Sequence, residues 1–74
     1  MILVSDKAHV RTITLNRPDA MNAFNGALFD SLTEGLLEAG EDSNVRVVVL
    51  TGKGKAFSTG LDLSEVGKNM EPPK

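Results

Sequence analysis

The residues best suited to chemistry in this 74-residue sequence lie in one glycine-containing segment, residues 52–63. This glycine loop reads Gly-Lys-Gly-Lys-Ala-Phe-Ser-Thr-Gly-Leu-Asp-Leu and holds three of the seven glycines. Glycine lets a backbone approach a ligand closely and adopt conformations that other residues avoid. If a helix follows, its free N–H groups and positive dipole end favour a negative ligand. The loop therefore predicts a site for a phosphate or for the negative oxygen that forms on a reacting carbonyl.

The residues of the glycine loop are compared with three interpretations: a phosphate-binding loop, an oxyanion donor and a turn without a ligand. The P-loop pattern fails because no glycine stands five residues before Gly54 and no Ser or Thr follows Lys55. The dinucleotide pattern fails because Phe57 stands where a third glycine belongs. In the oxyanion interpretation, the Leu61 N–H points outward where a helix starts. A tight turn with Asp62 as a helix N-cap explains the same residues without a ligand. This interpretation is favoured on the residues alone, because most glycine-rich turns are only turns.

The first segments of the chain predict a hairpin. Residues 1–4 are apolar and predict an edge strand, and residues 5–8 predict a turn. Residues 9–15 alternate with period two and are rich in β-branched side chains, which predicts an antiparallel partner strand. Pro18 lacks an N–H and ends that strand, and residues 20–24 form a connector.

A single amphipathic helix is expected over residues 26–39. Asn25 is the predicted N-cap, and Gly40 fits the C′ position that ends many helices. Apolar residues recur at three- and four-residue steps and form one expected core stripe: Leu28, Phe29, Leu32, Leu36 and Ala39.

A third strand is expected over residues 45–50, which are almost continuously apolar, as in strands buried on both faces of a parallel sheet. The predicted fold class is α/β: a ββα unit of hairpin, helix, buried strand and glycine loop. Residues 63–66 predict a helical turn. Residues 67–74 contain two prolines and predict a loose tail, so the expected domain covers residues 1–66.

Composition excludes several classes of function. The net charge of -2 with scattered basic residues argues against a nucleic-acid surface. The sequence has no cysteine and one histidine, so neither a disulfide nor a metal site is expected. His9 is predicted to lie on the surface or to face the hairpin. No apolar run is long enough for a membrane span, and the first residues do not resemble a signal peptide, which predicts a cytoplasmic protein. A core of this size is marginal, and association with other copies is the remaining route to stability.

Four colinear segments resemble the N-terminal part of the crotonase superfamily, the enoyl-CoA hydratase/isomerase family. They are Ile13-Thr14-Leu15-Asn16-Arg17-Pro18, Met21-Asn22-Ala23-Phe24, residues 45–52, and Lys55-Ala56-Phe57-Ser58-Thr59-Gly60-Leu61-Asp62-Leu63. The resemblance covers nearly the whole chain. It implies an incomplete version of the family's spiral fold, a coenzyme A thioester as substrate and no covalently bound cofactor.

The resemblance implies roles for particular residues. The Leu61 backbone N–H matches one donor of the family's oxyanion hole, and Gly60 permits close approach of the thioester. Ala56 and Ser58 match the part that holds coenzyme A through backbone contacts, and Asp62 and Leu63 complete that motif. Asp62 is expected to brace the loop. Lys53 and Lys55 are expected to be solvated, with contact to a coenzyme A phosphate as the lesser alternative.

The opposite wall of the implied groove matches Asp19, Ala20 and Asn22. Many family members carry a basic residue near position 19, so the acidic Asp19 weakens a phosphate-binding role there.

The resemblance also implies what this chain lacks. The family's second oxyanion donor and its catalytic carboxylates come from later segments, and neither Glu65 nor Glu71 lies where it could replace them. One donor is typically worth only about two to three orders of magnitude in rate, so the isolated chain is expected to be nearly inactive. The alternatives are a non-catalytic module that forms homo-oligomers and binds coenzyme A weakly, and a nucleotide-binding loop.

Overall fold

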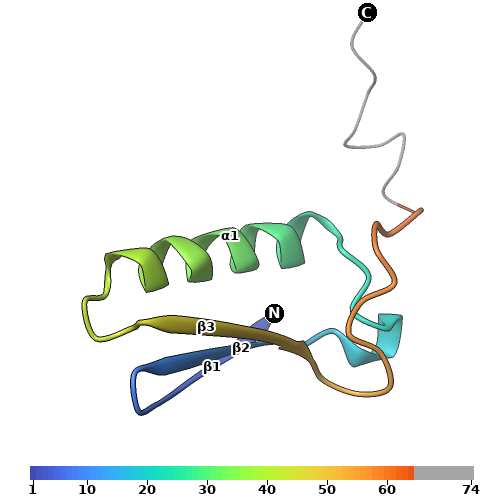
Figure 1. Cartoon of the computed structure of the whole chain (residues 1–74). Coiled ribbons are helices and arrows are strands. Elements are labelled where there is room, and N and C mark those ends of the chain that lie inside the picture. The colour runs from blue at the N-terminus through green and yellow to red at the C-terminus, as the bar shows by residue number, and fades with distance from the viewer. Residues whose placement is uncertain (65–74) are drawn as a thin grey trace, which may run out of the picture.

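The computed structural model describes residues 1–64, which form a three-stranded sheet with one helix across one face (Figure 1). The elements are β1 (Ile2–Lys7), β2 (Val10–Leu15), the 3-10 turn η1 (Pro18–Ala20), α1 (Gly26–Glu41) and β3 (Val47–Gly52). The sheet order is β1-β2-β3, with β1 antiparallel and β3 parallel to β2. The predicted α/β order of hairpin, helix, strand and glycine loop is confirmed. The predicted helical turn over residues 63–66 lies partly outside the described residues, and the predicted tail over residues 67–74 lies wholly outside them.

The hairpin turn lies later in the chain than predicted. Lys7 pairs with Val10, so the turn consists of Ala8 and His9, with φ of 51° and 68°. Two positive φ values are typical of a type I′ turn, which favours Asn-Gly. Because Ala-His carries no such signal, the prediction of a turn over residues 5–8 was wrong. The His9 backbone carbonyl accepts hydrogen bonds from the Arg46 and Val47 N–H groups, at 2.8 and 3.3 Å, and this supports the turn.

Helix α1 begins where expected and ends later. The Asn25 side chain caps it by accepting from the Leu28 N–H at 2.8 Å, as predicted. The predicted end at Ala39, with Gly40 just beyond the helix, is wrong, because the helix continues through Glu41. Arg11 on β2 fixes this end of the helix by donating to Asp42 at 2.9 Å. A glycine inside a helix costs only about 1 kcal/mol, so the helix tolerates Gly40 within its last turn.

The core is small because three strands offer a narrow surface. Ile13, Leu15 and Leu28 are fully buried, and Ala39 is nearly so. The predicted apolar stripe is only partly correct, because one of its members, Phe29, remains 61% exposed. Leu36 is likewise 44% exposed, and the helix instead turns the buried Gly35 toward the sheet. A Cβ on Gly35 would lie 2.7 Å from Ile2 Cδ1, so helix and sheet approach closely there.

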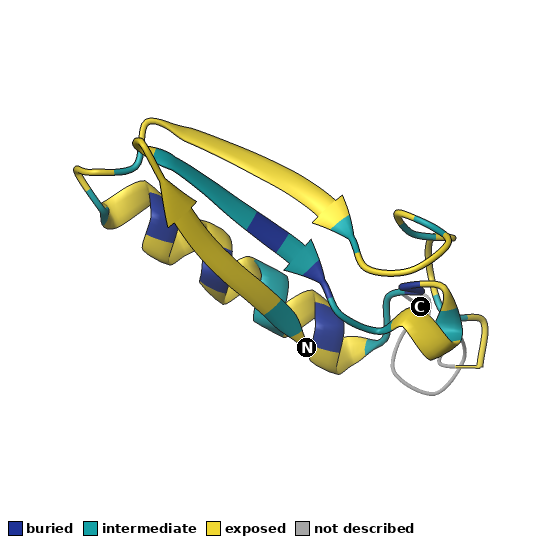
Figure 2. Ribbon diagram, turned by 90° about the horizontal axis from the view of Figure 1, so that it is seen from below, coloured by how far each residue is buried: buried dark blue, intermediate teal, exposed yellow. Residues whose placement is uncertain are grey.

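Strand β3 is exposed, contrary to the prediction of a strand buried on both faces. Val47, Val48, Val49 and Leu50 are 37% to 52% exposed. Figure 2 shows the more deeply buried β2 between two largely exposed strands. Within residues 1–64, only β2 pairs with β3, and α1 packs against β1 and β2 rather than over β3. Residues 1–64 therefore leave much of the apolar surface of β3 uncovered.

Candidate functional site

The glycine loop leaves β3 and turns back beside the connector (Figure 1). Lys53 donates its N–H to the Leu15 carbonyl at 2.9 Å, which extends the pairing of β2 with β3 past Gly52. Gly54 has φ of 93°, and a Cβ there would lie 3.1 Å from Pro18 Cβ. Glycine is therefore needed at position 54 both for the left-handed conformation and for the close approach to η1.

Asn22 ties the connector to the glycine loop from inside the protein. Its side chain is fully buried, and its backbone φ is 56°. The amide oxygen accepts from the Arg17 N–H at 2.8 Å, and the amide nitrogen donates to the carbonyls of Lys53 and Ala56 at 3.0 and 2.8 Å. The Asn22 carbonyl accepts from the Ser58 hydroxyl at 2.8 Å. These bonds satisfy the buried amide and fix the loop.

Leu61 lies opposite Phe24 in an isolated parallel bridge. The Phe24 N–H donates to the Gly60 carbonyl at 2.7 Å, and the Asp62 N–H donates to the Phe24 carbonyl at 2.9 Å. Because neighbouring peptide groups of an extended chain point in opposite directions, the Leu61 N–H and carbonyl face away from Phe24. Among residues 1–64, the Leu61 N–H has no hydrogen-bond acceptor. It is a backbone donor on the outer side of the loop.

Asp62 anchors the C-terminal side of Leu61. The hydrogen bond from the Ser64 hydroxyl, at 2.6 Å, and that from Arg17, at 2.8 Å, lower the pKa of Asp62 to about 2. Arg17 Nη1 also donates to the Ala23 carbonyl at 2.8 Å, so its guanidinium joins the connector to the loop. A carboxylate with such a low pKa is a poor proton acceptor at neutral pH. Its contacts are those of a brace.

The remaining predicted binding residues lie around this junction. Ser58 donates to the connector and accepts from the Gly60 N–H at 3.1 Å. Ala56 contributes its carbonyl to the same junction. Asp19 is exposed on η1 and Ala20 is half-buried, while Leu63 is exposed on the loop. The structure brings the two predicted walls together, and the binding of coenzyme A by these residues remains a prediction.

Two participants were missed in the sequence. Arg17 and Phe24 lie in two of the family-like segments but were given no role at the site, yet they hold Asp62 and Leu61 in place. The opposite charges of Arg17 and Asp62 were the available signal, but 45 positions separate the two residues in sequence. A local sequence pattern does not indicate which residues so far apart come into contact.

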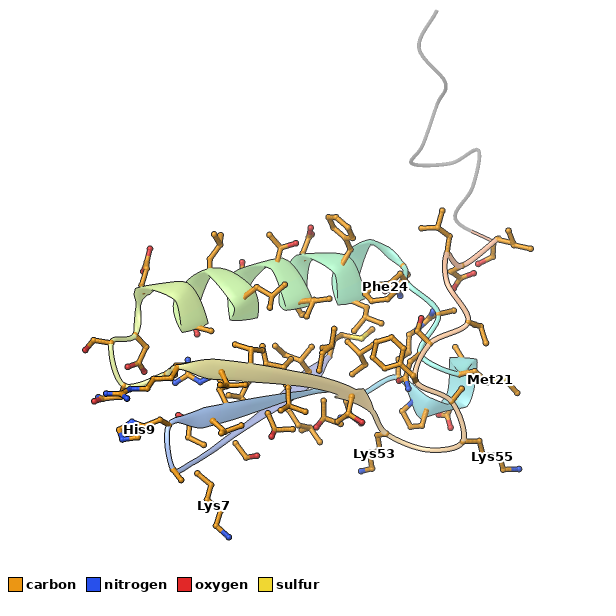
Figure 3. All side chains as sticks on the ribbon, viewed as in Figure 1. Lys7, His9, Met21, Phe24, Lys53 and Lys55 are labelled. Carbon is orange, nitrogen blue, oxygen red and sulfur yellow. The ribbon has the colours of Figure 1, made fainter. Side chains whose placement is uncertain are left out.

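The other predicted surface residues lie apart from the junction. Figure 3 shows Lys53 and Lys55 pointing outward from the glycine loop, whereas His9 lies at the opposite end of the sheet. His9 is exposed, as predicted, and it lines a shallow pocket of about 180 Å³ beside the hairpin turn. Among the described residues, no three His, Cys, Asp or Glu side chains group as a metal site. No helix within residues 1–64 is sufficiently long and apolar to cross a membrane.

Comparison with known proteins identifies the family. The model of the family described as enoyl-CoA hydratase/isomerase matches residues 5–74. The chain belongs to the enoyl-CoA hydratase/isomerase family. The resemblance to the crotonase superfamily, inferred from four short segments, is confirmed.

Relatives of the enoyl-CoA hydratase/isomerase family match nearly all of this chain but only part of their own length. The probable enoyl-CoA hydratase echA8 of Mycobacterium tuberculosis is 38% identical over 65 residues, covering 88% of this chain and 25% of that protein. The mitochondrial Delta(3,5)-Delta(2,4)-dienoyl-CoA isomerase of Rattus norvegicus is 38% identical over 72 residues, covering 96% of this chain and 22% of that protein. This chain therefore spans about a quarter of the length of these curated relatives.

Solved structures of the enoyl-CoA hydratase/isomerase family share the fold of this chain. The crystal structure of enoyl-CoA hydratase EchA8_6 from Mycobacterium marinum gives a TM-score of 0.86 at 49% identity. The match covers 97% of this chain and 34% of that one. The crystal structure of an enoyl-CoA hydratase from Mycobacterium tuberculosis gives a TM-score of 0.86 at 41% identity, and the match covers 96% of this chain and 32% of that one. The chain is thus an incomplete α/β unit of the crotonase fold.

Proposed function

We propose that this chain supplies one donor of an oxyanion hole for a coenzyme A thioester, through the Leu61 backbone N–H. In the corresponding enolate, negative charge develops on the thioester oxygen, and an aligned N–H stabilises that charge more than the neutral carbonyl. The observation that supports the proposal is the bridge between Phe24 and Leu61, which turns this N–H outward. The parent reaction is hydration or isomerisation of an enoyl-CoA, without a covalently bound cofactor.

The proposed groove lies between the start of the connector and the glycine loop. Ala56, Ser58 and Gly60 present backbone to the ligand on one side, with Ala20 across from them. The exposed carboxylate of Asp19 disfavours a phosphate beside it. The outward lysines of the glycine loop are better placed to attract the phosphates of coenzyme A.

The isolated chain is proposed to bind a thioester without turning it over efficiently. One N–H stabilises part of the enolate charge, but Asp62 is a poor base and no second donor has been assigned within residues 1–64. We expect a crotonyl-CoA hydration assay at micromolar protein to show no clear turnover. Clear turnover would contradict the requirement for carboxylates and a second donor from later segments.

Binding is tested separately by titrating the ¹⁵N-labelled chain with crotonyl-CoA and recording its amide resonances. We expect the Gly60 and Leu61 resonances to shift, while those of the hairpin turn at Ala8 and His9 stay in place. ATP serves as the control ligand because it shares the adenine and phosphates but has no thioester. Equal shifts at Leu61 with ATP would favour a nucleotide-binding loop instead.

The exposure of β3 favours a second candidate function, self-association as a non-catalytic module. An apolar strand at a sheet edge is a template for pairing with another chain. We propose that homo-oligomers form through this edge, with weak coenzyme A binding at most. Light scattering tests the idea on the chain and on a Val49→Lys variant, which places a charge on the exposed strand. A monomer that melts cooperatively would count against self-association. A cytoplasmic location remains a prediction from the sequence alone.

A further inference from the structure

We propose that Asn22 is a positioning residue whose buried side chain, together with Ser58, sets the direction of the Leu61 N–H. The geometric part of this inference concerns the protein alone, and its consequence for a thioester rests on the proposed function. Asn22 thus acts through the glycine loop, without touching the ligand.

The Asn22 amide matches the hydrogen-bonding groups around it. The side chain meets one donor, the Arg17 N–H, and two acceptors, the carbonyls of Lys53 and Ala56. Only a primary amide of this length offers one acceptor oxygen and two N–H donors in that arrangement. Asparagine also tolerates the positive φ of 56° better than most residues. With the side chain fully buried and its polar atoms bonded to protein, its effect on a ligand is indirect.

Hydrogen bonds connect Asn22 to Gly60, directly before Leu61. The Asn22 carbonyl holds the Ser58 hydroxyl at 2.8 Å, and the Ser58 oxygen accepts the Gly60 N–H at 3.1 Å. The Gly60 carbonyl then accepts the Phe24 N–H at 2.7 Å, two residues after Asn22. The connector and the loop are therefore joined directly before Leu61. Since the peptide bond that carries the Leu61 N–H belongs to Gly60, fixing Gly60 fixes the direction of that N–H.

The test replaces one donor group while keeping the side-chain size. In Asn22→Asp, the introduced carboxylate still accepts from Arg17 but faces the carbonyls of Lys53 and Ala56 without a proton to share. Repulsion and burial should raise its pKa above the ordinary value of about 4. Lowering the pH would protonate it and restore one donor. A variant that merely loosens packing, such as Asn22→Ala, offers no such rescue.

The readout is the amide spectrum of the full chain, recorded as a function of pH for the wild type and both variants. We expect the Gly60 and Leu61 resonances of Asn22→Asp to differ from wild type at neutral pH and to return toward it on acidification. The Ile13 and Leu28 resonances should stay fixed, which shows that the core is intact. Asn22→Ala should differ at all pH values. The wild-type pH series is the reference for resonance shifts that come from other charged groups of the connector and the glycine loop. These groups are Arg17, Asp19, Lys53, Lys55 and Asp62.

Wild-type Leu61 resonances in Asn22→Asp at neutral pH would overturn the proposal. If the core resonances are lost, Ser58→Ala tests the part of the proposal that runs through Ser58, because it removes the link between the Asn22 carbonyl and Gly60. Hydrogen exchange at Gly60 should then be about fivefold faster and the Leu61 resonance displaced. An unchanged Leu61 resonance in Ser58→Ala would also overturn the proposal. Crotonyl-CoA titration of the wild type is scored separately, so failure to bind refutes the proposed function while the Asn22 coupling is still measured.

Discussion

Phe24 and Leu61 face each other across a single parallel bridge, formed by hydrogen bonds of 2.7 and 2.9 Å on either side of Leu61. The bridge uses the Gly60 carbonyl and the Asp62 N–H, and it leaves the Leu61 N–H outside the pairing. A residue held on both sides while its own N–H faces outward is a preorganised donor. Such a donor does not need to reorganise when charge develops on a ligand.

The first prediction separates the Leu61 backbone from its side chain. Leu61→Pro removes the N–H, whereas Leu61→Ala keeps it and shortens a side chain that is 55% exposed. A hydrogen bond to a neutral carbonyl contributes about 1 kcal/mol, so Leu61→Pro should weaken crotonyl-CoA binding about fivefold relative to Leu61→Ala. Isothermal titration of the two variants measures the difference.

The infrared carbonyl band of bound crotonyl-CoA provides an independent measure of the same contact. A hydrogen-bonded carbonyl absorbs at lower frequency, so the band should shift down with Leu61→Ala and shift less with Leu61→Pro. Identical bands in the two complexes would mean that the Leu61 N–H does not contact the thioester oxygen.

The second prediction concerns pH and the ion pair between Arg17 and Asp62. The pKa of Asp62 is lowered from 3.8 to about 2 in the folded protein. Folding therefore gains stability from Asp62 ionisation above about pH 4, and this gain is lost as the pH falls through about 2. We expect the difference in unfolding free energy between wild type and Asp62→Asn to shrink over that interval.

Urea unfolding of both proteins at several pH values measures this difference. Arg11 also lowers the pKa of Asp6, chiefly through a hydrogen bond, but that contribution is present in both proteins and cancels. A difference that stays constant from neutral pH to about pH 2 would show that ionised Asp62 does not stabilise the fold.

The third prediction contrasts two glycines. A Cβ on Gly52 would lie 2.7 Å from the Ala56 carbonyl oxygen and 2.8 Å from the Asn22 amide nitrogen, so Gly52→Ala should destabilise by about 1–3 kcal/mol. Gly40→Ala meets nothing within 4 Å and should stabilise the helix by about 0.5–1 kcal/mol. Thermal unfolding compares them, and equal melting temperatures would contradict the close packing inferred around Gly52.

The order of elements was predictable because its signals are local. Alternating residues indicate β2, and a three- to four-residue repeat after Asn25 indicates α1. The choice of Leu61 as a candidate donor followed from the resemblance of the glycine loop to a family motif. By contrast, the helix runs past Gly40 to Glu41, and Arg11 on another element holds the C-cap residue Asp42. The local pattern contains no sign of that tertiary contact at the helix end.

The exposure of β3 and the contacts around Leu61 were not predictable for a related reason. The apolar run of β3 predicts a strand covered on both faces, as in a complete sheet. Within residues 1–64, only β2 pairs with β3, so this cover is missing. The pairing of Phe24 with Leu61 and the ion pair of Arg17 with Asp62 join segments far apart in sequence. Loop residues without periodicity give no register, so the sequence predicted an outward Leu61 N–H only from an expected helix start, and not from the bridge to Phe24.

The fourth prediction follows from the hairpin turn. Ala8 adopts φ of 51°, a left-handed conformation that costs an ordinary L-residue about 1–2 kcal/mol. Asparagine tolerates this conformation and is favoured at the first position of a type I′ turn. Ala8→Asn should therefore stabilise the chain by about 1 kcal/mol, raise its melting temperature, and leave the His9 contact with the Asn44 carbonyl intact. Ser5→Asn is the matched control, because it introduces the same side chain at an exposed position of β1, where asparagine is disfavoured. Equal stabilisation by the two changes would show that the positive φ of Ala8 is not the cause.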